Sequence, residues 1–425
     1  MLPEIFLILT YTILFSAIIW FWKFYPRGRK AKQFLILIFW LKILAGIGYG
    51  QYHIHHVDGG DTFRYFEDGN LVFKTLRNNP IKYLHLLTAR SSGTIPSDIA
   101  PELHAMHVWN SSGNYTMVRF NGFVRLFSFG FYNVHVVFMA FLVLTGLLAF
   151  YKFLYDAAFE NKKALVFAVF LVPSVLFYGS GLHKESLLIA GLGFLLWAFA
   201  RIIRQDFRLA SWIGFITGAL LVYIVREFYL VALIPGLLAY ASIQFVKSGK
   251  QITFSLMLLT FWIAFFMLHF LIPQFDPLKN MIERQQEFLI LQGHSNISIT
   301  PLHHNFFSLL LHVPMALINV ILRPFPNEAT TFGLIIYAIE NLLLLCFFIL
   351  SMVYTRILPE ALRHKSWLLL SFSITAFIII GCIVPNMGAI SRYRSPAILA
   401  WTAFISLKLA PQKLTIFRWI PEIIF

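Results

Sequence analysis

Residues 252–273 read ITFSLMLLTFWIAFFMLHFLIP and contain no Asp, Glu, Lys or Arg. An apolar run of about 20 residues is what an α-helix needs to cross the hydrocarbon core of a bilayer. Hydrophobic residues make up 59% of the 425-residue chain and charged residues 12%, whereas soluble domains are nearer half apolar and a quarter charged. The sequence therefore predicts an all-α, polytopic transmembrane helical bundle.

Similar apolar runs recur along the chain and predict about eleven spans in a single integral membrane domain, residues 1–425. Residues 305–322 are interpreted as a re-entrant or interfacial helix, because counting them as a span would place the basic residues of 356–365 outside. The spans are expected near 3–22, 33–51, 132–152, 164–180, 186–203, 209–225, 228–246, 252–273, 331–353, 366–384 and 395–409.

Basic residues cluster in alternate connections, after the first, third, fifth, seventh, ninth and last predicted spans. The positive-inside rule makes these connections cytoplasmic, which predicts a multi-pass cell (inner) membrane protein with its N-terminus outside and its C-terminus in the cytoplasm. The formal charge of +15 comes from basic residues that are spread through short inter-helix loops. We therefore expect the lipid bilayer, and no nucleic acid, as a partner.

The two long outer loops, 52–131 and 274–330, are predicted to carry interfacial helices. Helical patterns occur around 70–90 and 117–128, and an amphipathic run extends from Leu278 to Leu291. Chemistry is expected on this outer face, because the cytoplasmic loops offer only scattered Lys and Arg.

The first outer loop begins with a polar stretch, His53 to Gly69, that reads HIHHVDGGDTFRYFEDG. Gly59 and Gly60 allow a tight turn, so the carboxylates of Asp58 and Asp61 can face one cavity. We predict that these two Asp residues are catalytic, although a solvated loop is the alternative. The histidines show no helical i,i+4 pair, so no metal site is assigned, while a divalent metal cofactor remains possible.

Four further polar motifs occupy outer ends of predicted spans, at 180–186, 226–229, 323–328 and 391–396. We interpret them as a cationic wall for an anionic headgroup, because the planar fork of Arg can grip a phosphate through two hydrogen bonds. Ion pairs that pin the hairpins, or Arg stacked on aromatic rings, are the alternatives. The candidate substrate-binding residues are His183, Lys184, Glu185, Arg226, Arg323, Arg392, Tyr393 and Arg394.

An intramembrane carboxylate, Glu340, lies in the middle of the ninth predicted span. Such a group is functional or paired by default, and the adjacent Asn341 is expected to help satisfy it.

The general layout of the chain and three of its segments resemble the polyprenyl-phosphate-dependent glycosyltransferases of the GT-C fold. The segments are 60–65 (GDTFRY), 173–185 (PSVLFYGSGLHKE) and 392–396 (RYRSP). More narrowly, they are similar to bacterial envelope-polysaccharide proteins of that type. The resemblance covers the layout of most of the chain and rests on short motifs.

The resemblance implies a GT-C-like fold in which the loop acid, a general base or metal ligand, corresponds to Asp61 and less directly to Asp58. It also implies that the outer Arg and Lys motifs grip phosphate. The chain departs from the pattern because a span precedes the catalytic loop and Thr62, rather than a second acid, follows Asp61. Metal dependence and the exact substrate are therefore left open.

The expected activity is that of a glycosyltransferase on the outer face, with inversion and with Asp61 as general base. The donor would be a polyprenyl-phosphate-linked sugar and the acceptor a glycan or a lipid-linked molecule. One alternative is an O-antigen or exopolysaccharide polymerase or ligase. A second is a lipid-linked glycan transporter or flippase, although the chain shows no internal repeat and its polar motifs gather at one face.

Overall fold

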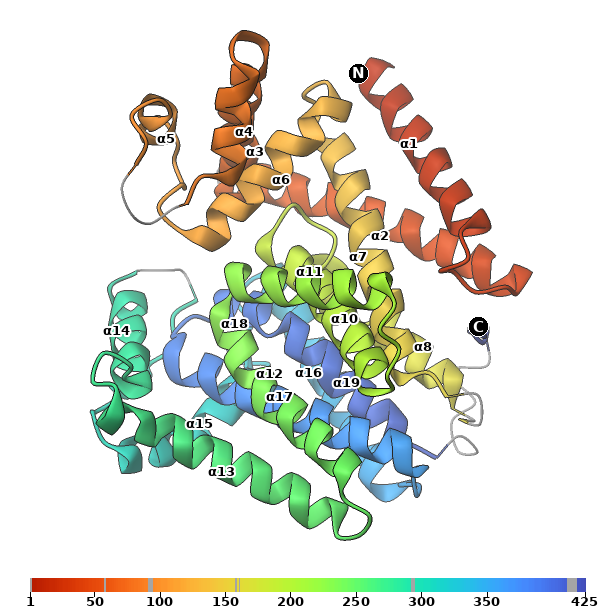
Figure 1. Cartoon of the computed structure of the whole chain (residues 1–425), viewed down its shortest axis with the longest axis vertical. Helices are drawn as coiled ribbons and strands as arrows, with labels where there is room; N and C mark the ends of the chain where they lie inside the picture. The colour runs from red at the N-terminus through yellow and green to blue at the C-terminus, as the bar shows by residue number, and fades with distance from the viewer. Residues whose placement is uncertain are drawn as a thin grey trace. The chain divides into compact units, whose positions relative to one another are not determined.

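The structure is a computed structural model that describes residues 2–56, 59–90, 95–156, 159, 161–291, 295–410 and 419–425. Within these ranges the chain forms α-helices and a short 3-10 turn, with isolated bridges and no strand (Figure 1). The all-α class predicted from hydropathy is confirmed.

Eight of the described helices are long and apolar enough to cross a membrane, as expected of a multi-pass membrane protein. Each overlaps a span predicted from the sequence. They are α1 (Leu2–Phe21), α2 (Arg29–His56), α7 (Tyr132–Leu154), α10 (Lys184–Ile203), α12 with its 3-10 extension (Glu227–Phe245), α13 (Lys250–Leu271), α16 (Phe332–Val353) and α17 (Glu360–Ile383).

The other three predicted spans differ from a continuous membrane-crossing helix. The span expected over 164–180 is two helices, α8 (Lys162–Phe170) and α9 (Pro173–Tyr178), because proline lacks an N–H and disfavours helical geometry in the residue before it. The last two are short: α11 (Leu209–Val225) has 17 residues and α19 (Ser395–Lys408) has 14.

Residues 305–322 form the 16-residue helix α15 (Phe306–Ile321), which contains Pro314. At 1.5 Å per residue its length is about 24 Å, less than the hydrocarbon core of roughly 30 Å. It packs closely on α17, where a Cβ added to Gly381 would lie 2.3 Å from the carbonyl oxygen of Ala316. A short helix is what the re-entrant or interfacial interpretation requires; its depth in the membrane stays a prediction.

The two long connections predicted to be outer loops contain helices. Residues 52–131 contain α3 (Gly60–Asn78), α4 (Pro80–Thr88), α5 (Ala100–His104) and α6 (Ser112–Ser128). The amphipathic run near 278–291 is α14 (Pro277–Ile290), and α18 (Met387–Tyr393) precedes α19.

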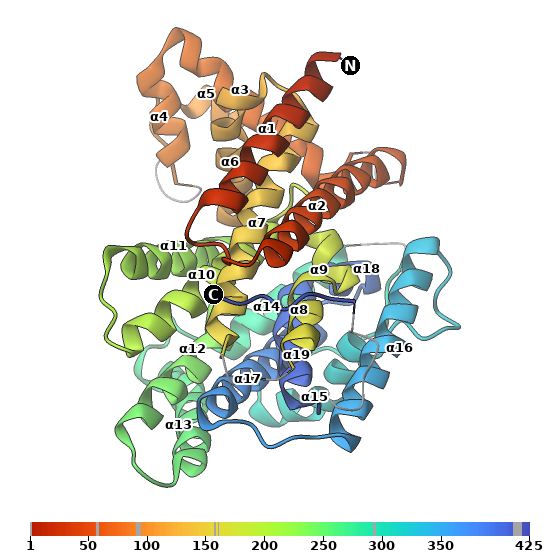
Figure 2. The ribbon, with the colours of Figure 1, turned by 90° about the vertical axis from the view of Figure 1, so that its right-hand side faces the viewer.

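The chain divides into two compact units, and the single integral membrane domain stays a prediction. Unit 1 comprises Met1–Phe153, Val175–Glu227 and Ile420–Phe425, and unit 2 comprises Leu154–Ser174 and Phe228–Trp419. In unit 1, α1 and α2 meet at the turn 22–28 and diverge from it (Figures 1 and 2).

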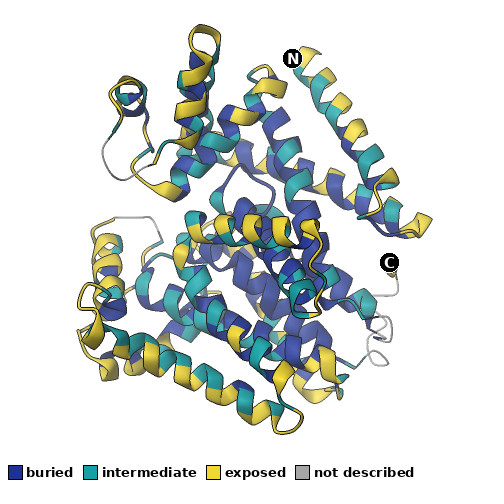
Figure 3. Cartoon of the chain, viewed as in Figure 1, coloured by how far each residue is buried: buried dark blue, intermediate teal, exposed yellow. Residues whose placement is uncertain are grey.

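Burial differs sharply between the candidate spans. In unit 1, 83% of the apolar window of α7 is buried inside the chain, and α7 crosses α10 so closely that a Cβ on Gly193 would lie 1.9 Å from the backbone oxygen of Gly146. In unit 2, only 6% of the window of α13 is buried, and Figure 3 colours most of this helix as exposed or intermediate. Such an apolar surface suits contact with lipid.

The loops of unit 2 sort to opposite ends of α17. At its start, Lys250 Nζ lies 2.5 Å from Glu360 Oε1, which joins the beginnings of α13 and α17. Beyond its end, the backbone N–H of Met387 donates to the carbonyl of Ser295 at 2.9 Å, which joins the first residue of α18 to the segment after α14. Which side of the membrane each end faces stays a prediction.

Candidate functional site

Asp61 lies in the first turn of α3, directly after the turn made by Gly59 and Gly60. These glycines have φ angles of 81° and 54°, a region that L-residues with a side chain adopt at a cost. The Asp61 side chain is 39% exposed, and a carboxylate is favourable at the positive end of a helix dipole. Asp58, the second predicted catalytic acid, lies outside the described residues.

A buried chain of charged groups occupies the start of α10 in unit 1. The Glu185 carboxylate is fully buried; its Oε1 accepts hydrogen bonds from Arg226 Nη2 at 2.7 Å and Nε at 3.1 Å. Its other oxygen, Oε2, is bonded to Nδ1 of the buried His183. A buried carboxylate is stable in such a place only when it is paired and hydrogen-bonded, as it is here.

The chain ends at Asp61. His183 Nε2 lies 3.9 Å from Asp61 Oδ2, an ion-pair distance somewhat longer than a direct hydrogen bond. Because an ionised Glu185 can only accept, it selects the tautomer of His183 that carries a proton on Nδ1, which leaves Nε2 facing Asp61. The structure thus brings together the motifs at 60–65 and 183–185 and Arg226.

Lys184 points to a different partner from its neighbours. Its Nζ donates to Asn114 Oδ1 at 2.7 Å, and the hydroxyl of Tyr65 donates to the same oxygen at 3.0 Å. These bonds connect α10, α6 and α3, so the helix that carries Asp61 is tied to the helix that follows His183. The sequence assigned neither Tyr65, which ends the 60–65 segment, nor Asn114 a role at the site.

Lys42 is a further residue that the sequence analysis missed. It is fully buried in α2, and its Nζ donates to Gly179 O at 2.8 Å and to Ser180 Oγ at 3.0 Å. These bonds hold the turn that leads into His183. The sequence could have indicated Lys42, because a lysine within the apolar run 33–51 must have an internal partner.

A cavity of 510 Å³ lies along the first turns of α3. Gly60, Phe63, Arg64 and Glu67 line it from one helical face, and His107 lines it from the loop before α6. The loop is anchored by the fully buried carboxylate of Asp68, which accepts from the backbone N–H of His107 at 3.1 Å and from its Nδ1 at 2.9 Å.

The sequence assigns no metal site to the early histidines. His53 Nδ1 is bonded to the carbonyl of Tyr49 at 2.9 Å, a local contact within α2. Among the residues that the structure describes, no group of three His, Cys, Asp or Glu side chains could hold a metal ion. Divalent metal dependence stays a prediction.

In unit 2, Arg394 is completely buried and its guanidinium is engaged inside the protein. It donates to the carbonyl of Val320 and to Oδ1 of Asn341, and its Cζ lies 4.2 Å from the centre of the Tyr337 ring. This arrangement fits the aromatic-stacking alternative for Arg394 better than a phosphate grip.

The neighbouring basic residues also have internal contacts. Arg323 Nη2 lies 3.0 Å from Glu328 Oε1, and its Nη1 donates to Asn319 at 3.2 Å. The guanidinium of the half-buried Arg392 lies 5.1 Å from the ring of Tyr393, which is itself buried. Arg392 is therefore the more accessible arginine of the 392–396 motif, and its role in binding stays a prediction.

The partner of Glu340 differs from the expected one. Its carboxylate accepts from the backbone N–H of Ser174 at 3.1 Å. Asn341 instead donates to the carbonyl of Arg323 at 2.7 Å and accepts from Arg394. Adjacent residues on a helix point about 100° apart, which is why Asn341 serves other groups.

No protein-family model matches the chain, and comparisons with curated proteins and with solved structures found no match. The functional assignment therefore rests on the sequence and on the geometry of the two units.

Proposed function

We propose that the protein is a membrane glycosyltransferase that moves a sugar from a polyprenyl-phosphate-linked donor to a glycan or lipid-linked acceptor, on the outer face of the membrane. The observation that carries the proposal is the pairing of a partly exposed Asp61 with the buried chain formed by His183, Glu185 and Arg226. A GT-C-like fold is part of the same proposal.

Asp61 acts as the general base. As the acceptor oxygen attacks the anomeric carbon, its O–H bond breaks and the proton passes to the Asp61 carboxylate. The bond between the anomeric carbon and the phosphate oxygen breaks, and the departing phosphate takes the electron pair. A single displacement of this kind inverts the anomeric centre, and a well-placed base contributes roughly 10²–10⁴-fold to the rate.

The buried chain sets the charge state around the base. Arg226 keeps Glu185 ionised, and Glu185 orients the imidazole of His183, an arrangement in which a carboxylate holds a histidine in one tautomer. Nε2 of His183 lies 3.9 Å from Asp61 Oδ2, so the imidazole faces the carboxylate that acts as the base. His183 and Glu185, first considered only as substrate-binding residues, thereby become positioning residues for the base.

The cavity beside α3 supplies a place for the acceptor. Its 510 Å³ falls within the usual range for small-molecule sites, roughly 300–1,000 Å³. Arg64, Glu67 and His107 provide both donors and acceptors to sugar hydroxyls, and Phe63 adds an aromatic ring. Asp61 follows the cavity-lining Gly60 directly in the sequence.

The experiment reconstitutes the purified chain in liposomes and supplies a radiolabelled polyprenyl-phosphate monosaccharide. Asp61→Asn should lower transfer by about 10²-fold or more while the protein inserts normally. Asp98→Asn is the matched control, because Asp98 is an exposed acid of the same loop whose carboxylate is bonded to His85 at 2.8 Å. Full activity of Asp61→Asn would remove Asp61 as the base.

The same preparation separates the competing functions. Transfer only from an oligosaccharide-lipid donor would favour the polymerase or ligase. Movement of an unaltered lipid-linked glycan across the bilayer, without transfer, would favour the flippase.

A further inference from the structure

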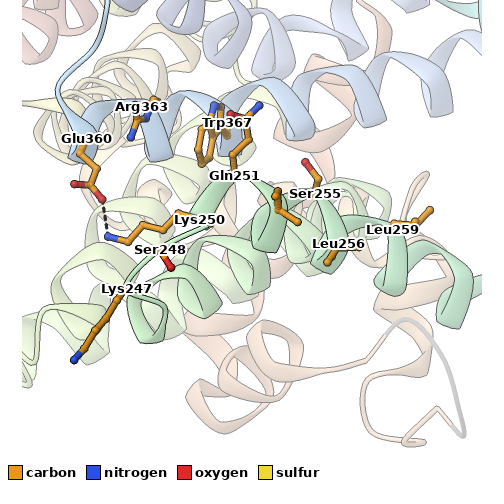
Figure 4. A pocket seen from close by; sticks show the side chains of 12 residues that line it. Lys247, Ser248, Lys250, Gln251, Ser255, Leu256, Leu259, Glu360, Arg363 and Trp367 are labelled. Carbon is orange, nitrogen blue, oxygen red and sulfur yellow. Dashed lines mark hydrogen bonds and ion pairs between the residues drawn. The ribbon is translucent and has the colours of Figure 1, made fainter.

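A groove of 690 Å³ lies in unit 2 where the start of α13 meets the start of α17. Figure 4 shows charged side chains at one end of it, with Leu256 and Leu259 further along α13. The groove therefore has a polar end and an apolar wall, and the proposed transferase site includes none of its residues.

The polar end carries three cations and one carboxylate. Lys247 lies in the turn before α13, and Lys250 is the first residue of α13. Arg363 lies in the first turn of α17. Glu360 pairs with Lys250 at 2.5 Å. The excess of positive charge favours an anionic ligand.

The apolar wall follows one face of α13. Ile252, Leu256 and Leu259 have the i, i+4, i+7 spacing of a single helical stripe, and they are 66%, 55% and 58% exposed. Since α13 is long and apolar enough to span a membrane, this stripe runs from the polar end toward the hydrocarbon core.

An aromatic residue joins the two parts. Trp367 lies on α17 between the charged end and the helix interior, and the Cζ of Arg363 is 5.8 Å from its ring. On its other side Trp367 packs against Phe254 of α13, with ring centres 5.5 Å apart. Tryptophan is enriched at the level of lipid headgroups, where one edge is wet and the other apolar.

We infer that this groove binds an anionic phospholipid, whose phosphate lies against Lys250 and Arg363 and whose acyl chain follows Ile252, Leu256 and Leu259. A soluble phosphate would use the charged end alone and leave the stripe without a role. The acyl chain of a zwitterionic phospholipid would fit the stripe, but its neutral headgroup would be attracted less strongly by the excess of basic side chains. The inference does not depend on the proposed transferase activity.

The test uses the full chain in nanodiscs of phosphatidylcholine that contain phosphatidylglycerol with a diazirine in its acyl chain. After illumination, mass spectrometry of the peptides should find cross-links on Ile252 to Leu259. Arg363→Gln should reduce them about fivefold, because one basic residue near an anionic surface is worth ~1 kcal/mol. Arg363 is exposed on α17, so the variant is expected to fold.

Two further variants frame the result. Glu360→Gln removes the only carboxylate among the described groove residues and should increase the cross-links. Arg208→Gln is the control, because this arginine is 80% exposed and lies outside the groove; its cross-links should equal those of the unaltered chain. Equal labelling of α13 in the Arg363→Gln variant would overturn the inference.

Excess inorganic phosphate distinguishes the two sources of the anion. Cross-links that persist in its presence support a lipid held by both ends of the groove. Their complete loss would show that the groove is a site for soluble phosphate, and the lipid would be rejected.

Discussion

Glu185 holds Arg226 in a buried ion pair, with both Nη2 and Nε of the guanidinium bonded to one carboxylate oxygen, at 2.7 and 3.1 Å. The second oxygen is thereby left for His183, and through it Glu185 is linked to Asp61. Four residues from three separate segments of the sequence form one electrostatic unit. Its energetics can be tested independently of any substrate.

Glu185→Gln should destabilise unit 1 by about 3–5 kcal/mol, because it removes the fully buried carboxylate charge that pairs with the guanidinium of Arg226. Thermal unfolding in detergent measures the loss. Asp206→Asn breaks a comparable pair, Arg201 with Asp206 at 2.7 Å, whose side chains are about a quarter exposed. This control should change stability by only about 0–1 kcal/mol. Equal effects in the two variants would contradict the role of burial.

Gly193→Ala should weaken the crossing of α7 and α10, because its Cβ would meet the backbone of Gly146, which cannot rotate away. We expect a loss of about 1–3 kcal/mol, the usual cost of overpacking. Gly48→Ala is the matched control, since a Cβ there meets nothing within 4 Å. It should leave the melting temperature unchanged or raise it slightly, because alanine favours helix. A Gly193→Ala protein as stable as the Gly48→Ala protein would argue against this close crossing.

Arg394→Lys should lower stability by about 1–3 kcal/mol, because one ammonium cannot reproduce the fork that serves Val320 and Asn341. Donor affinity should change little beyond the effect of unfolding. Arg392→Lys should show the opposite pattern, a raised donor KM at an unchanged melting temperature. The reason is that Arg392 is only half-buried and its guanidinium lies against the ring of the adjacent Tyr393. Reversed results would restore Arg394 as the residue that grips phosphate.

The cap of α14 should respond to acid. Asp276 accepts from the backbone N–H of Lys279 at 2.9 Å and from His304 Nε2 at 2.6 Å. Burial raises the pKa of Asp276, but the Lys279 and His304 hydrogen bonds outweigh it, so the pKa lies below its ordinary value of 3.8. Because the folded pKa is the lower one, this stabilisation is complete above pH 3.8 and is lost as pH falls through the folded pKa.

Hydrogen exchange of the α14 amides measures that loss. Protection should decrease below pH 3.8 in the unaltered chain, and less steeply in Asp276→Asn, whose amide oxygen still caps the helix but does not titrate. The same pH dependence in both proteins would show that another group controls the end of this helix.

Hydropathy predicted most of the helices, because the ability of a segment to cross a bilayer depends on its own residues. It therefore located α13, α16 and α17 without knowledge of their neighbours. Over 164–180 hydropathy indicated one span, whereas the structure has two helices that are separated just before Pro173. Hydropathy counts apolar residues and takes no account of the backbone N–H that proline lacks. The GT-C resemblance and the function stay predictions.

The sequence by itself determined the class of this protein and marked the polar motifs at 60–65, 183–185 and 226, because charges in so apolar a chain need partners. Only the tertiary structure decided who those partners are. In the structure Asp61 lies beside His183, Lys42 donates to the turn at 179–180, and Arg394 donates to Asn341 inside the protein. The reason is physical: hydropathy is a property of one segment, whereas pairing depends on how closely helices distant in sequence pack, as Gly193 and Gly146 show.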